Sequence, residues 1–114
     1  MSASSLPNHD AVRREAALAE YAVMDTPAEP AFDSLVEEAA RFCRTPIAVM
    51  SLLGRRRQWF KARVGVELTE TPIEQAVCAL AADGDKLLVI SDLAADPRTA
   101  ANPLVLGEPH IRFY

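Results

Sequence analysis

The stretch Pro46–Gly65, PIAVMSLLGRRRQWFKARVG, contains two strand-like segments separated by a glycine and three arginines. Ile47–Leu53 is apolar at almost every position, which is typical of a strand that is covered on both faces and lies centrally in its sheet. Gln58–Val64 alternates apolar and polar residues, which predicts a strand with one face in water. The turn between them completes the pattern of an antiparallel hairpin.

Helical patterns precede this hairpin. Asp10 is placed to cap a helix over Ala11–Val23, whose apolar face is weak. Thr26 and Glu29 have the spacing of a capping box with Pro27 in the first turn, so we expect a second helix to begin there. Its apolar positions recur at helical spacing and form one continuous stripe: Phe32, Leu35, Val36, Ala39, Ala40 and Cys43.

The pattern after the hairpin begins with another capping box. Thr71 and Glu74 precede apolar residues at helical spacing up to Ala81, and a polar turn, residues 83–86, then leads into a strand-like run, residues 87–91. A long polar loop follows, with one helical turn begun by Asp92, and the chain ends on a further strand pattern. The order helix, helix, strand, strand, helix, strand, loop, strand predicts an α+β domain with helices packed on an antiparallel sheet.

The composition is that of one small domain. The chain has 114 residues, 50% of them hydrophobic, so it can bury roughly two-thirds of its surface on folding. A formal net charge of -4 argues against nucleic-acid binding, which needs a large basic face. No apolar run approaches the roughly 18 residues of a membrane span and no signal peptide is recognisable, so we expect a cytoplasmic protein with no membrane partner. We assign residues 1–9 to a disordered tail and residues 10–114 to the domain.

The last residues form an incomplete pattern. Ile111–Tyr114 alternates like a half-buried strand, but no turn and no returning strand follow it. We therefore expect that Tyr114 is a cut and that the domain is incomplete at its C-terminal end. The strand 47–53 then has one obvious neighbour in the chain, and an apolar edge left unpaired favours oligomers or aggregation.

Four blocks closely resemble bacterial GAF domains, of the type found N-terminally in sensor histidine kinases and diguanylate cyclases: MDTPAEPAFDSL, PIAVMSLLGRRRQWFKARVG, ETPIEQAVCALA and DLAADPRTAANPLVLGEPHIRFY. The resemblance covers nearly all of residues 18–114. It implies a sensory module with a pocket between one sheet face and the loops and short helices above it, and it does not imply an enzyme. We therefore expect a regulatory homodimer that binds a small molecule or relays a signal to an output domain in the same polypeptide, a histidine kinase or a diguanylate cyclase.

We take the candidate ligand-binding residues from these blocks: Trp59, Cys78, Asp92, Arg98 and Tyr114. Trp59 can serve as a ligand platform, and the alternative is a ring packed under neighbouring side chains. Asp92 also has the character of a turn-forming residue, as have Asp96 and Asn102. No catalytic triad, phosphate loop or zinc motif is recognisable, so we name no catalytic or metal-binding residue, and the cofactor is unknown.

The cysteines and the arginines carry the remaining hypotheses. Cys43 continues the apolar stripe of its helix and is expected to be packed inside, whereas Cys78 lies away from the centre of its own stripe and is expected to face a pocket or solvent and to react faster. The hairpin carries a basic cluster with no acid among its members: Arg55, Arg56, Arg57, Lys61 and Arg63. A solvated hairpin face explains this cluster, and steering of an anionic ligand or an acidic partner is the alternative.

Two alternatives to the sensory function stay open. The segment VCALAA loosely resembles a cysteine segment of the free methionine sulfoxide reductases, which would make this a redox-active protein that uses Cys78. The second alternative is a dimerisation module without a ligand.

Overall fold

The computed structural model describes residues 5–82, 84 and 86–114, with residues 5–11 described by their backbone. It contains helices and a three-stranded antiparallel sheet, which confirms the α+β class. The chain divides into two compact units, Met1–Ile73 (unit 1) and Glu74–Tyr114 (unit 2), and each is described by itself. A single domain over residues 10–114 stays a prediction.

The helices of unit 1 begin at other residues than the sequence predicted. Helix α1, Ser5–Tyr21, begins before Ala11, and helix α2, Pro30–Cys43, begins after the expected capping box. The box does not form because its side chains bind elsewhere: Lys61 Nζ lies 2.6 Å from Thr26 Oγ1 and 2.7 Å from a Glu29 carboxylate oxygen. Pro30 itself provides the first-turn proline of α2.

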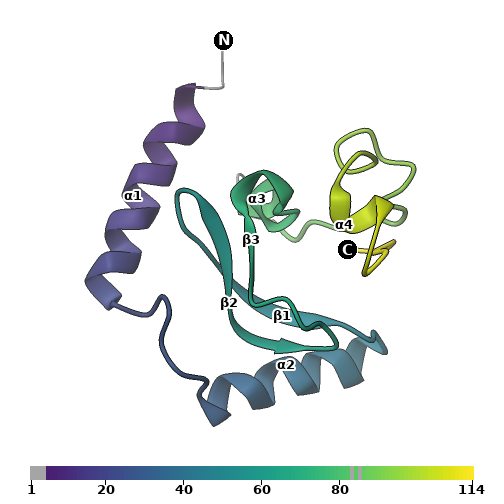
Figure 1. Ribbon diagram of the computed structural model, residues 1–114, viewed down its shortest axis with the longest axis horizontal. Coiled ribbons are helices and arrows are strands. Elements are labelled where there is room, and N and C mark those ends of the chain that lie inside the picture. The colour runs from purple at the N-terminus through teal and green to yellow at the C-terminus, as the bar shows by residue number, and fades with distance from the viewer. Residues whose placement is uncertain (1–4, 83, 85) are drawn as a thin grey trace. The chain divides into compact units, whose positions relative to one another are not determined.

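The sheet has the strand order β1-β2-β3, with β1 at Ala48–Leu53, β2 at Arg57–Val64 and β3 at Glu70–Pro72 (Figure 1). The predicted hairpin is confirmed, because β1 pairs antiparallel with β2. Among the described residues β1 pairs with β2 alone, the one neighbour that the sequence offered, and β2 is the middle strand. A central position for β1 in a longer domain stays a prediction. Most of β1 is half-buried, and α2 lies along one face of the sheet and covers it.

A β-bulge in β2 changes which side chains are buried. Met50 pairs with Ala62 and Ser51 pairs with Phe60, which leaves Lys61 as the extra residue. Lys61 and Ala62 are adjacent and both buried, so the alternation of β2 is broken. The alternation of the strand predicted that Lys61 faces water, and this is wrong, because the bulge turns its side chain to the buried side.

The segment after β2 begins as a strand rather than a helix. Thr71 lies in β3, is 3% exposed, and its hydroxyl accepts a hydrogen bond from Gln58 Nε2 at 3.2 Å. The second capping box is therefore not formed, because Thr71 is used in the sheet. A short 3-10 turn, Ile73–Gln75, and helix α3, Cys78–Ala82, replace the predicted single helix.

Unit 2 packs around a small apolar core beside α3 and helix α4, Pro103–Leu106. The buried members of this core are Val77, Ile90, Leu93 and Val105. The predicted strands at residues 87–91 and 111–114 are not formed as regular strands; instead, Ile90 and Tyr114 exchange both backbone hydrogen bonds, at 2.7 and 2.9 Å. Of the predicted polar turn at residues 83–86, positions 83 and 85 lie outside the described residues.

Candidate functional site

A cavity of about 560 Å³ lies in unit 1 between α1 and the turn that joins β1 to β2. Its apolar lining comes from α1 and the segment after it, and α1 also contributes the carboxylate of Glu15. The turn contributes three guanidinium groups. We call this site the arginine-turn cavity, and its lining residues are Glu15, Leu18, Ala19, Ala22, Met24, Gly54, Arg55, Arg56 and Arg57. Its size falls in the range of pockets that hold small molecules.

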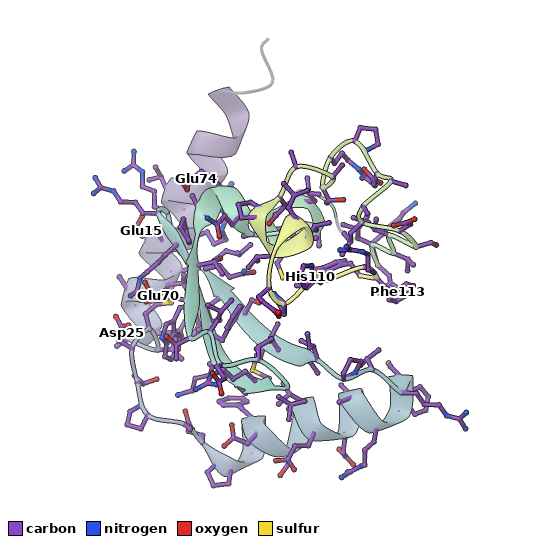
Figure 2. The ribbon with its side chains drawn as sticks, turned by 45° about the vertical axis from the view of Figure 1, so that its right-hand side comes forward. Glu15, Asp25, Glu70, Glu74, His110 and Phe113 are labelled. Carbon is purple, nitrogen blue, oxygen red and sulfur yellow. The ribbon has the colours of Figure 1, made fainter. Side chains whose placement is uncertain are left out.

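Arg57 is held in place by two carboxylates. One of its terminal nitrogens lies 2.8 Å from an oxygen of Asp25 and 2.8 Å from an oxygen of Glu70, and the other lies 2.5 Å from the second oxygen of Asp25 (Figure 2). Its hydrogen bond to Asp25 is the main cause that raises the pKa of Arg57 above its usual value, and the same bond lowers the pKa of Asp25. The pairing neutralises Arg57 and fastens the α1–α2 segment and β3 to the start of β2.

Arg55 and Arg56 differ from Arg57 in their surroundings. Both side chains are exposed, and neither forms an ion pair with a side chain of residues 12–82, 84 or 86–114. Glu15 contributes one negative charge to the same cavity, so the lining is mixed rather than uniformly basic. Two available guanidinium forks beside an apolar wall are suited to a ligand that carries an anionic group and a flat ring.

Lys61 forms a second, buried polar cluster in unit 1. Its side chain is 2% exposed, and its ammonium group donates to Thr26 Oγ1 and to the carbonyl oxygen of Pro27 at 2.6 and 2.8 Å and pairs with Glu29 at 2.7 Å. It also lies 6.0 Å from the centre of the Phe32 ring. All donors of the ammonium group are therefore used, which makes Lys61 a structural residue.

The basic cluster expected from the sequence is consequently not one surface. Arg57 and Lys61 pair with acids from other segments, and Arg63 donates to the carbonyl oxygen of Val66 at 2.8 Å. Of the five members, only Arg55 and Arg56 are exposed basic side chains without an acidic partner among the described side chains, as the sequence had suggested for the whole cluster. No local spacing in the sequence predicts these pairs, because Asp25 and Glu29 lie more than thirty residues before the groups they bind.

The predicted ligand-binding residues fall in both units. Trp59 lies on β2 in unit 1 and is half-buried, opposite Leu52 on β1 and Glu70 on β3. The other four lie in unit 2, where Cys78 forms a hydrogen bond with Tyr114. Burial is the main cause that raises the pKa of Tyr114, and this hydrogen bond adds to it. A ligand-binding role for all five residues stays a prediction.

Asp92 and Arg98 take part in local turns of unit 2. An Asp92 carboxylate oxygen accepts from the backbone N–H of Ala94 at 3.0 Å, as the turn-forming interpretation predicted. Arg98 pairs with Asp96 at 2.7 Å, and the Asp96 carboxylate also accepts from the Arg98 backbone N–H at 2.8 Å. These hydrogen bonds lower the pKa of Asp96 to about 2.

The packed position expected for Cys43 is wrong, whereas the position expected for Cys78 stays a prediction. Cys43 is exposed at the last residue of α2, although it lies on the same side of the helix as the buried Val36. Cys78 is half-buried at the first residue of α3. In the described ranges, no group of three or more His, Cys, Asp and Glu side chains is placed to hold a metal ion. No helix in the described part of the chain is long and apolar enough to cross a membrane.

Comparison with known proteins finds a relative among signalling enzymes. The chain is 37% identical over 101 residues to a cyclic di-GMP phosphodiesterase of Pseudomonas aeruginosa. The aligned segment covers 89% of this chain and 17% of that relative. No family model matches the chain.

These comparisons correct three expectations from the sequence. The assignment to GAF domains is wrong, because no family model supports it and the similarity found is to a cyclic di-GMP phosphodiesterase. The expectation that the chain does not belong with enzymes is contradicted, because that relative is named as an enzyme. The expected output domain, a histidine kinase or a diguanylate cyclase, is also unsupported, because the relative is named as a phosphodiesterase of cyclic di-GMP.

Proposed function

We propose that this chain takes part in signalling through cyclic di-GMP, as a segment of a protein that breaks this dinucleotide down. The single observation that carries the proposal is the 37% identity over 101 residues to a cyclic di-GMP phosphodiesterase. That identity extends over 89% of the chain, so it includes both units rather than one motif. The segment spans 17% of the relative, and the activity of the whole protein is therefore part of the proposal.

The arginine-turn cavity is our candidate for the contact with the dinucleotide. Cyclic di-GMP carries two phosphodiester groups and two flat guanine rings, and an arginine fork suits both a phosphate and the face of a ring. Arg55 and Arg56 offer two such forks, and Leu18 and Met24 contribute apolar surface to the same cavity. We propose that occupation of this cavity regulates the breakdown.

A double substitution tests this contact in the whole protein. Arg55→Gln with Arg56→Gln removes both available charges, and we expect the Kd for cyclic di-GMP or its linear product to rise at least about tenfold, because a charge-assisted hydrogen bond is worth roughly 1.5–3 kcal/mol. Isothermal titration calorimetry with each nucleotide gives the Kd. The stability of the double variant should stay within about 0.5 kcal/mol of the parent, since both side chains are exposed.

Arg63→Gln is the matched control, because Arg63 is an exposed arginine of the same hairpin that does not line the cavity among the described residues. Its Kd should be unchanged. Equal loss in the control and the double variant would reject the arginine-turn cavity as the contact while leaving the proposed breakdown untouched. If the whole protein is folded and does not degrade cyclic di-GMP, the proposal that it breaks down this dinucleotide is wrong.

A further inference from the structure

Glu15 brings a carboxylate into the arginine-turn cavity. It lies on α1 (Figure 2) and lines the cavity together with Arg55 and Arg56 of the turn. Its side chain is exposed, and it forms no ion pair with a side chain of residues 12–82, 84 or 86–114. The carboxylate and the two guanidinium groups therefore share one cavity without pairing with each other, and all three are available to a ligand.

A ligand that contacts all three groups needs two different edges. A carboxylate only accepts hydrogen bonds and a guanidinium group only donates them, so the ligand must present donors at one edge and acceptors or negative charge at another. Guanine does so, because its N1–H and its N2 amino group donate side by side, whereas O6 and N7 accept. The two oxygens of a carboxylate can accept from N1–H and from N2 in parallel, as they accept from an arginine fork.

Adenine presents a different arrangement at the corresponding edge. Its N1 is an acceptor and its N6 amino group is the donor, so one oxygen of a carboxylate placed there would face a lone pair. A site that hydrogen-bonds a donor of its ligand rejects an analogue without that donor, because a polar group of the site is then left unpaired. A carboxylate in the arginine-turn cavity therefore favours guanine nucleotides over adenine nucleotides.

We infer that Glu15 selects guanine in the arginine-turn cavity by accepting hydrogen bonds from N1–H and N2 of one base of cyclic di-GMP. Arg55 and Arg56 then contact the phosphate and the edge that carries O6 and N7. Leu18 and Met24 supply the apolar surface against which the flat ring packs. This inference rests on the proposed function, since it names the base that the cavity recognises in the same dinucleotide.

Glu15→Gln in the whole protein tests the selection. Glutamine keeps the shape of the side chain, and its amide offers one donor and one acceptor, which complement N1 and N6 of adenine. Isothermal titration calorimetry gives the Kd for cyclic di-GMP and for cyclic di-AMP at the site that Arg55→Gln with Arg56→Gln weakens. The ratio of the Kd for cyclic di-AMP to the Kd for cyclic di-GMP should fall at least about tenfold in Glu15→Gln.

Glu20→Gln is the matched control, because Glu20 is an exposed glutamate of α1 that does not line the cavity among the described residues. It should keep the ratio of the parent protein. Circular dichroism checks that both variants stay folded. An unchanged ratio in Glu15→Gln, or an equal change in the control, would overturn the inference, while breakdown of cyclic di-GMP by the same protein would leave the proposed function in place.

A double-mutant comparison places the effect in the cavity. When Arg55 and Arg56 are already replaced by glutamine, Glu15→Gln should no longer change the ratio, because these side chains act on the same bound nucleotide. A change of the same size in that background would mean that the base is selected elsewhere in the polypeptide, and would overturn the inference. A folded parent protein that binds the two dinucleotides equally well, or binds neither, would overturn it as well.

Discussion

Lys61 is the residue whose environment departs furthest from its position in the strand pattern. A buried ammonium group is costly unless it is paired and hydrogen-bonded, and here a bulge directs it toward three oxygen acceptors in the segment between α1 and α2. The same contacts withdraw Thr26 and Glu29 from helix capping. One side chain thus attaches the segment before α2 to the sheet.

Replacement of Lys61 should therefore destabilise unit 1. Lys61→Met keeps most of the volume and removes the charge, and we expect a loss of about 1–3 kcal/mol in the free energy of unfolding, limited because Glu29 is 55% exposed and can be solvated again. Chemical denaturation measures the loss. Arg63→Met on the same strand is the control and should stay within about 0.5 kcal/mol. Equal losses would mean that the buried contacts contribute nothing specific.

Asp96 gives a pH-dependent test in unit 2. Its pKa is lowered from 3.8 to about 2 because Arg98 donates hydrogen bonds from its side chain and its backbone to the carboxylate. The folded pKa lies below the unfolded one, so this group stabilises the folded chain above about pH 4, and that stabilisation is lost as the pH falls towards 2.

Nuclear magnetic resonance of the side-chain carboxyl group measures this shift. The titration midpoint of Asp96 should lie near 2 in the parent and move up towards 3.8 in Arg98→Ala, while substitution of the exposed Lys86 leaves it unchanged. A midpoint that is the same with and without Arg98 would show that the pairing is not maintained in solution.

At the scale of elements, the hairpin was predictable and the segment after it was not. The apolar run of β1 and the alternation of β2 depend on local sequence, so both strands appear where the pattern places them. The capping boxes failed because Thr26 and Thr71 bind side chains of β2, and such long-range competition leaves no signal in the local spacing. The exposure of Cys43 was missed because helical spacing gives the side of a helix but not how far along it the cover extends, and Cys43 is the last residue of α2.

Gly65, just after β2, tests the geometry of the hairpin's end. It has a φ of 81°, and a Cβ there would lie 1.9 Å from the carbonyl oxygen of Pro46. Gly65→Ala should therefore cost more than about 2 kcal/mol, because it adds a clash with backbone to a strained conformation. Gly84→Ala is the control, since nothing lies within 4 Å of its Cβ position, and it should change the stability by less than about 1 kcal/mol. Thermal unfolding measures the Tm of both variants, and we expect a clearly lower Tm for Gly65→Ala than for Gly84→Ala. Similar Tm values would contradict the close approach of Gly65 to Pro46.

At the scale of the whole molecule, the α+β class followed from the order of the patterns, but the candidate site did not. The predicted ligand-binding residues are divided between two units, and the arginine-turn cavity combines a helix and a turn that lie far apart in the sequence. The sequence identified the arginines of the turn, yet it gave no means of telling the paired Arg57 from the available Arg55 and Arg56. Only the folded arrangement separates them, because the acids that bind Arg57 come from the α1–α2 segment and from β3.

The most direct test of the proposed function is the fate of cyclic di-GMP in the presence of the purified whole protein. Ion-exchange chromatography follows the loss of the dinucleotide and the appearance of its linear product, with and without Mg²⁺. The proposal predicts steady conversion that depends on protein concentration and that changes when Arg55 and Arg56 are replaced by glutamine. A folded protein that leaves cyclic di-GMP intact in both buffers would contradict it.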